Sequence, residues 1–204
     1  MKNTIKILAT VMACVFVILL LQSCGKNYTK FYEDEDNPEL SIFSDKGNNV
    51  MSCYINNSPW QTNDRLRNSE FTSITTYVLN IFRDTSSPIY DFLYFSWFGN
   101  YKGTINNRVD NVKLCLQIPK RFPLTRLNQF SGQRIIMDTT NGFFLKGEVR
   151  NKKIPGVVFF KTLIIDSSSL GFKGKLAGIF EAELGSFQIT KGRFDHELVY
   201  ENFQ

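Results

Sequence analysis

The sequence predicts an all-β protein, a single antiparallel barrel or sandwich of about nine or ten strands. From residue 50 onward, apolar and polar side chains alternate along the chain, which is the period of a strand with one buried face. Turn-forming residues interrupt this alternation at short intervals, and Asn141-Gly142 is a strong hairpin signal. No stretch of this region has the period of an amphipathic helix.

The expected strands follow from the alternation and its interruptions. They cover residues 50–55, 72–83, 89–98, 112–118, 134–138, 143–150, 157–166, 172–184 and 187–200. We expect a turn at residues 56–59 and either a loop or one helical turn at residues 120–130, which contain and follow prolines. The strand 172–184 is the clearest, since its apolar residues share one face and its lysines and glutamates share the other.

The last strand changes phase partway along. Its early apolar residues are odd-numbered and its later ones, from Phe194 on, are even-numbered, so one residue must be absorbed between them. Gly192 is the natural position for a β-bulge. Beside it, Arg193 and Asp195 lie on one face and are expected to form a structural ion pair, with each other or with neighbours.

Residues 1–26 have the layout of a secretory signal. Lys2 and Lys6 precede an apolar run over residues 7–21 in which only Thr10 is polar. As a helix this run would be roughly 22 Å long, short of a hydrocarbon core of about 30 Å, so a permanent transmembrane helix is the weaker interpretation.

Leu21-Gln22-Ser23-Cys24 follows the run and resembles the bacterial lipobox. The resemblance implies that Cys24 receives a diacylglyceryl group, that the chain is cut before it and that its new amine is acylated, with a fatty acid such as palmitate. It also implies the outer membrane, because Gly25-Lys26 lacks the aspartate that retains many lipoproteins in the inner membrane. The alternative is an ordinary signal peptide with a chance cysteine.

Three segments are therefore expected: a signal peptide over 1–23, a lipidated and flexible acidic tether over 24–48, and one antiparallel β domain over 49–204. The tether is polar and has no periodicity. Its run of four acids at residues 33–36 resembles the signal that exports Bacteroidota lipoproteins to the cell surface. The alternative is a solvated acidic linker.

Size and charge limit the function classes. Removing residues 1–23, which carry two lysines and no acid, leaves 181 residues with 22 bases and 19 acids. That length suits one domain with a core, and the small excess of positive charge does not predict nucleic-acid binding. The basic residues are concentrated in residues 120–161, a segment that contains nine basic and two acidic residues.

Cys53 and Cys115 would remain in a compartment that permits disulfides. Cys53 shares its phase with apolar residues, whereas Cys115 shares its phase with Lys113 and Gln117. One thiol should therefore point into the core and the other outward, which favours two free thiols over a disulfide.

Two short motifs carry a family resemblance. Residues 51–60, which read strand, Asn-Asn turn, then Trp60, and residues 190–195, Thr-Lys-Gly-Arg-Phe-Asp, resemble the opening and closing strands of uncharacterised Bacteroidota lipoproteins. The resemblance implies a calycin-like β-barrel or sandwich and an envelope location. It implies no shared activity.

The sequence offers no catalytic signature. His196, the only histidine, shares its phase with Phe194 and Leu198 and is expected on the core side or rim with its nitrogens satisfied. One histidine without a cysteine cluster lacks the ligands of a transition-metal site, and we predict neither metal nor cofactor. A carboxylate pair for glycoside hydrolysis could come from Glu181, Glu183, Asp195 and Glu197. Alternating carboxylates are more typical of a solvated strand face, so hydrolase is the weakest hypothesis.

The strand at residues 89–98 is apolar on both faces. One face carries Tyr90, Phe92, Tyr94 and Phe98, and the other carries Leu93, Phe95 and Trp97. Either the protein covers both faces, or one face meets a ligand or partner. With Trp60, the first set is the candidate surface for a glycan or an envelope protein, because such rings stack on sugars and suit protein contacts.

The predicted function is a non-enzymatic ligand- or partner-binding accessory lipoprotein of the outer membrane, held there by the lipids on Cys24. The alternative is a structural subunit of an envelope assembly. Such a subunit would pack through the second apolar face or through the basic segment 120–161. Residues 157–166 raise the same question as residues 89–98, because they too are apolar on both faces.

Overall fold

The computed structural model describes residues 31–62, 79–101, 111–138, 140–145, 152–168, 171–199 and 203. The expected signal peptide and the lipidation site Cys24 lie outside the described residues. So do parts of three expected strands, namely residues 72–78, 146–150 and 200.

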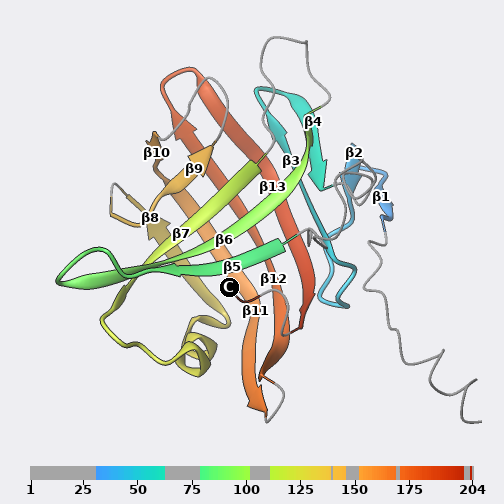
Figure 1. Cartoon of the computed structure of the whole chain (residues 1–204). Coiled ribbons are helices and arrows are strands. Elements are labelled where there is room, and N and C mark those ends of the chain that lie inside the picture. Colours follow the sequence, from blue (N-terminus) through green and yellow to red (C-terminus); the bar gives the residue numbers. More distant parts are fainter. Residues whose placement is uncertain are drawn as a thin grey trace, which may run out of the picture.

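The described part of the chain is almost entirely β-structure, and eleven of its strands form one antiparallel sheet that curls into a nearly closed barrel (Figure 1). The predicted all-β fold is confirmed, and the barrel is consistent with a calycin-like architecture. The order of neighbours is β10-β9-β7-β6-β4-β3-β13-β12-β11-β8, and β5 and β4 share one edge of β6. The strands are β3 (Val50–Ile55), β4 (Ser58–Thr62), β5 (Leu79–Asp84), β6 (Tyr90–Tyr101), β7 (Asn111–Pro119), β8 (Gln133–Met137), β9 (Phe143–Leu145), β10 (Lys153–Ile154), β11 (Gly156–Ser168), β12 (Gly171–Leu184) and β13 (Phe187–Leu198).

Strand β4 begins where the sequence predicts the second half of a turn. Asn56 and Asn57 have φ of 48° and 65°, the left-handed conformation of a two-residue hairpin turn, so the chain re-enters the sheet at Ser58. Pro59 has no backbone N–H to donate. It is tolerated because β6 pairs with β4 only from Trp60 onward.

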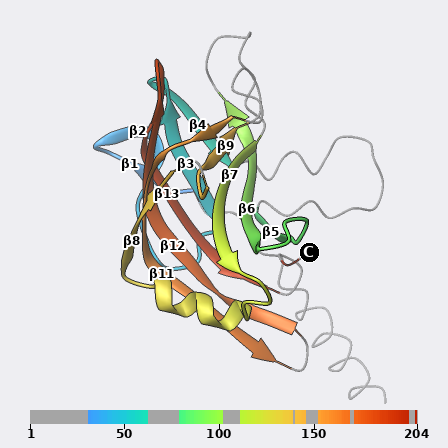
Figure 2. The ribbon, with the colours of Figure 1, turned by 90° about the vertical axis from the view of Figure 1, so that its left-hand side faces the viewer.

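A short 3₁₀-helix, η2 (Leu124–Phe130), lies across one end of the barrel, where the sequence predicts a loop or one helical turn (Figure 2). The helix buries its own residue Leu127 completely. The side chain of Asn128 fixes the helix to β11, since its Oδ1 accepts a hydrogen bond of 2.6 Å from the Ile165 backbone N–H.

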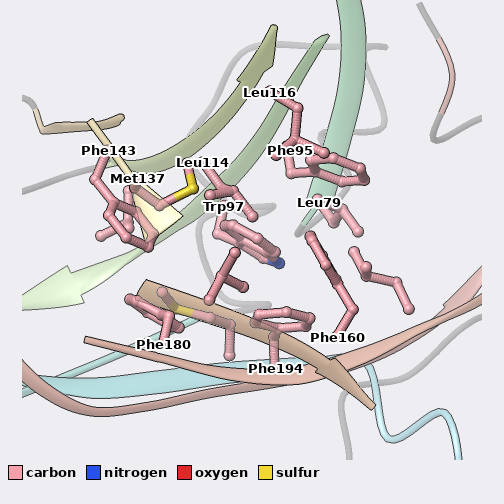
Figure 3. Packing of buried hydrophobic residues seen from close by; sticks show 14 of the residues in the cluster. Leu79, Phe95, Trp97, Leu114, Leu116, Met137, Phe143, Phe160, Phe180 and Phe194 are labelled. Atoms are coloured by element: carbon pink, nitrogen blue, oxygen red, sulfur yellow. The ribbon is translucent and has the colours of Figure 1, made fainter. Parts of the chain in front are cut away.

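The interior of the barrel is filled by its own side chains (Figure 3). Trp97 stacks on Phe194 with ring centroids 5.3 Å apart, and Phe194 also lies 5.9 Å from Phe160. Phe180 packs on Phe143 at 5.2 Å. Burial of such rings is the dominant stabilising contribution to a core of this size.

The predicted bulge in the last strand is confirmed. The pairing of β13 with β12 shifts between Phe180 and Ala182, and Lys191 carries the left-handed φ of 53°. Gly192 is needed for a different reason: a Cβ there would lie 2.5 Å from a ring carbon of Phe180. The ring of Phe180 thus covers the glycine of the neighbouring strand, a contact that only glycine permits.

The prediction of a flexible tether is wrong for residues 31–48. This segment forms a hairpin of β1 (Glu33–Asp34) and β2 (Asn37–Ser41) and packs on the outside of the barrel beside β3 and β13 (Figure 1). Leu40 is 0% exposed. The segment is fixed by side-chain to backbone hydrogen bonds, which leave no periodic signal in a sequence.

Asp195 on β13 organises that docking. Its carboxylate, 3% exposed, accepts hydrogen bonds from the backbone N–H groups of Gly47 at 2.7 Å, Asn48 at 3.2 Å and Lys46 at 3.3 Å. It also accepts one from the Ser44 hydroxyl. Asp195 therefore caps the turn that leads into β3.

Arg193 does not pair with Asp195. Its guanidinium bonds to the carboxylate of Asp34 and donates to the Ser41 carbonyl at 2.9 Å. That guanidinium also lowers the pKa of Asp34. The predicted ion pair is thus formed with a neighbour, and it ties β1 to β13.

Candidate functional site

The single histidine lies inside the barrel, on the core side as predicted. His196 is buried, and its Nε2 accepts a hydrogen bond of 2.9 Å from the Trp97 indole N–H. Desolvation by burial lowers the pKa of His196 to about 3, because the charged imidazolium is penalised inside the core. The side chain is therefore a neutral acceptor that fixes Trp97.

The four candidate carboxylates are placed in two environments. Glu181, Glu183 and Glu197 are exposed on the outer face, as expected of a solvated strand face, whereas Asp195 is occupied by the docked N-terminal segment. Among the residues described, no three of the histidines, cysteines and acids lie close enough to hold a metal ion. Within the same part of the chain, no helix has the length and apolarity to cross a membrane.

Cys53 and Cys115 are free and buried, with Cys53 in the barrel core and Cys115 on the outward-facing side of β7. The predicted opposite orientations are confirmed. Burial raises the pKa of the Cys115 thiol to about 12, and burial likewise raises the pKa of Tyr94, its neighbour across the strands, to about 12. Both groups are protonated at neutral pH.

Five aromatic side chains gather on the outer face of β5, β6 and β9, and we call them the aromatic platform: Phe82, Tyr90, Phe92, Tyr94 and Phe144. All five are half-buried. Ring centroids are 4.8 Å apart in the Phe82–Tyr94 stack, 4.9 Å in the Tyr90–Phe92 edge contact and 5.7 Å between Tyr94 and Phe144. The platform is therefore one continuous surface of rings.

Strand register builds the platform. Alternation along β6 sends Leu93, Phe95 and Trp97 into the core and leaves the even-numbered rings outside. Phe82 on β5 is the direct cross-strand partner of Tyr94. Phe144 enters from the other side of β6, because β9 pairs with β7.

Two lysine ammonium groups lie over the platform. Lys113 Nζ is 5.2 Å from the centroid of Phe82 and 5.9 Å from that of Tyr94. Lys153 Nζ is 5.2 Å from the centroid of Phe92 and 5.8 Å from that of Phe144. These are cation–π distances, so the rings hold both charges at the platform surface.

Part of the predicted candidate surface is assembled and part is not. Tyr90, Phe92 and Tyr94 lie together, and Phe98 is half-buried farther along β6. Trp60 does not belong to this surface: it is 0% exposed and packs in the core. The expectation for Trp60 fails because residues 58–62 form a strand whose alternation points the indole inward.

Sequence reasoning missed four members of the site, namely Phe82, Phe144, Lys113 and Lys153. The sequence contains one signal for Phe82, because its even position in the expected strand 72–83 places it on the same face as the polar Asn80. Phe144 and Lys153 have none, because only the pairing of β9 with β7 and β10 places them beside β6.

Strands β8, β11, β12 and β13 lie on the opposite side of the barrel from β5, β6 and β7 (Figure 2). A second apolar surface lies over their outer face. We call it the outer groove; its volume is about 1000 Å³. Phe159 and Ile179 line it, and Ile179 is 45% exposed. Ile136 on β8, 71% exposed, lies at its margin beside Arg134.

Comparison with models of known families, with curated proteins and with solved structures finds no match to this chain.

Proposed function

We propose that this chain is a lipid-anchored, non-enzymatic module of the outer membrane that binds a glycan on its aromatic platform. The observation that supports this most directly is the partial exposure of five contiguous rings on one outer face. Aromatic faces stack on the C–H faces of sugars, and tyrosine hydroxyls and lysine ammonium groups can hydrogen-bond sugar oxygens.

The packing of the core supports the outer surface as the binding site. Trp97, Phe160 and Phe194 fill the region where a ligand-binding barrel would hold its ligand. A ligand inside would have to displace rings in van der Waals contact, whereas the platform offers rings that are already partly exposed to solvent.

The test is a screen of full-length chain in detergent against immobilised glycans, with Phe92→Ala and Phe144→Ala as platform variants. Each variant should weaken capture at least about fivefold, since one stacked ring contributes about 1 kcal/mol or more. Phe159→Ala is the matched control, because it removes another half-buried, outward-facing ring from the opposite side of the barrel. Capture that survives both platform variants, or no capture at all, would contradict the proposal.

The anchor is tested separately. In a Bacteroidota host, Cys24→Ala should move the protein from the membrane fraction to the soluble fraction and remove the mass of the acyl chains. Two or three buried chains are needed for stable anchoring, at about 0.8 kcal/mol per methylene. An unprocessed leader, or unchanged fractionation of the variant, would refute the anchor without bearing on the platform.

The outer groove supports a second candidate function, a structural subunit of an envelope assembly that packs through this face. Exposed Ile136 and Ile179 beside Phe159 are typical of a protein contact. Ile179→Glu should abolish crosslinks to a partner in cells, while Phe92→Ala should leave them unchanged. A protein that is strictly monomeric and forms no crosslink in cells would exclude this function.

A further inference from the structure

Resting on the lipid anchor of the proposed function, we infer that the β1–β2 hairpin docks on the lipid surface through its open end, the end opposite its turn, and so orients the barrel. The docking face consists of four large apolar side chains: Phe31, Tyr32, Ile42 and Phe43. Their exposed fractions are 40%, 54%, 40% and 39%. Exposed apolar side chains that gather in one place mark a contact with a membrane or a partner.

Chain pairing brings the four side chains together. The register of β1 and β2 pairs Glu33 with Ser41. One residue farther from the turn, the Ile42 backbone N–H donates to the Tyr32 carbonyl at 2.7 Å. The two halves of the docking face therefore lie side by side. Phe43 also lines the outer groove, so the face continues onto the apolar outer side of β11 and β12.

The position of the anchor favours a lipid surface as the occupant of this face. Phe31 follows the proposed lipidation site Cys24 by seven residues. Seven residues span at most about 25 Å when fully extended, so acyl chains on Cys24 would hold the docking face within that distance of the bilayer. Tethering at short range gives the lipid surface a high effective concentration. Tyrosine is also a side chain that is enriched where membrane meets water, which suits Tyr32.

The charges on the hairpin and beside it fit this orientation. Glu35 and Asp36 are exposed at the turn, which is the end away from the docking face. Glu33, the acid next to the face, accepts a backbone N–H of the hairpin itself at 2.8 Å. Beside Phe43, Lys161 forms an ion pair of 3.1 Å with Asp45. We therefore expect apolar burial, and not net charge, to drive docking.

Docking through this face leaves the aromatic platform accessible from solution. Figure 1 shows β1 and β2 on one side of the molecule and the tip of the β5–β6 hairpin on the other. Tyr90 of the platform begins β6 at that tip. A ligand would therefore reach the platform while the docking face holds the other side of the molecule to the lipid.

The experiment measures contact between lipid and a dye on the docking face. Lipidated chain carrying Ile42→Cys is labelled with the fluorophore NBD and reconstituted into vesicles of phosphatidylcholine and phosphatidylethanolamine that contain doxyl-labelled lipid as quencher. Because Cys53 and Cys115 are buried, the dye attaches to the introduced cysteine. Gln117→Cys is the matched control, because it places the dye on an exposed residue of β7, on the platform side.

We expect doxyl lipid to quench the dye at position 42 but not at position 117, and we expect high salt to leave the quenching unchanged. Phe43→Asp should lower the ratio of docked to undocked protein about tenfold or more, because burial of one large apolar side chain is lost. Ile89→Asp is the control variant, since Ile89 is 77% exposed at the far hairpin. Tyr32→Asp repeats the test at the most exposed of the four side chains, and it decides the result if Phe43→Asp lowers the urea midpoint.

Two results would overturn the inference while the anchor stands: a dye at position 42 that lipid does not quench in chain shown by mass to be acylated, or quenching that survives both aspartate variants. Glycan capture should be unchanged in Phe43→Asp, so neither result bears on the platform. If mass spectrometry finds no acyl chain on Cys24, the proposed anchor fails, and the inference fails with it.

Discussion

Replacing Asp195 tests how the N-terminal segment is held on the barrel. The carboxylate accepts four hydrogen bonds, two of them short (from Ser44 and the Gly47 N–H) and two long (from Lys46 and Asn48). Hydrogen bonds to a charged group contribute about 1.5–3 kcal/mol when short. Taking about 1.5 kcal/mol for each short bond and about 0.5 for each long one, Asp195→Ala should cost about 4 kcal/mol.

Asp195→Asn keeps the shape and one neutral acceptor oxygen, so about half of the stabilisation, roughly 2 kcal/mol, should be lost. The assay is urea unfolding followed by tryptophan fluorescence, which reports the core because Trp60 and Trp97 are both buried. Hydrogen exchange at the Gly47 and Asn48 amides should accelerate in both variants before the core opens.

Asp45→Ala is the control, since Asp45 forms an exposed ion pair with Lys161 at 3.1 Å and should leave the unfolding free energy unchanged within error. If Asp195→Ala loses less than about 1 kcal/mol, or if the Gly47 amide keeps its protection, the four bonds do not hold the segment and the reasoning fails.

Three further predictions concern the barrel itself. Gly192→Ala should destabilise by about 1–3 kcal/mol in urea unfolding, because its Cβ would overlap the buried Phe180 ring; a loss below about 0.5 kcal/mol would show that the ring moves freely. The pKa of His196 is about 3 in the folded protein and near 6.5 in the unfolded chain, so only the unfolded chain binds this proton between pH 7.5 and pH 5. The free energy of unfolding should therefore fall by about 2 kcal/mol over that range. His196→Gln should remove this pH dependence, and a profile that is unchanged would contradict the buried neutral imidazole. Cys53 and Cys115 should both react with a thiol reagent only after unfolding, and a mass lower by two hydrogen atoms under oxidising conditions would instead indicate a disulfide.

Alternation in the sequence predicts which face a residue takes wherever the strand itself is recognised. It places His196 and Cys53 inside and Tyr94 and Cys115 outside, because side chains in a strand alternate regardless of the neighbouring strand. Trp60 is the exception. A proline and two asparagines predict a longer turn than the two-residue one that forms.

The sequence did not predict which strands pair with one another in the sheet. Phe144 and Lys153 complete the platform through pairings of β9 with β7 and β10, and no local pattern encodes that register. The docked segment at residues 31–48 escaped prediction for a related reason. Its order comes from Asp195 and Arg193, which lie about 150 residues farther along the chain.

The most direct test of a ligand site on the outer rings, and not in the barrel interior, is an NMR titration of isotope-labelled full-length chain with a glycan captured in the screen. We expect the aromatic signals of Phe92, Tyr94 and Phe144 to shift with added ligand while those of Trp97 and Phe160 stay unchanged. Shifts concentrated in Trp97 and Phe160, with the outer rings unaffected, would contradict this expectation.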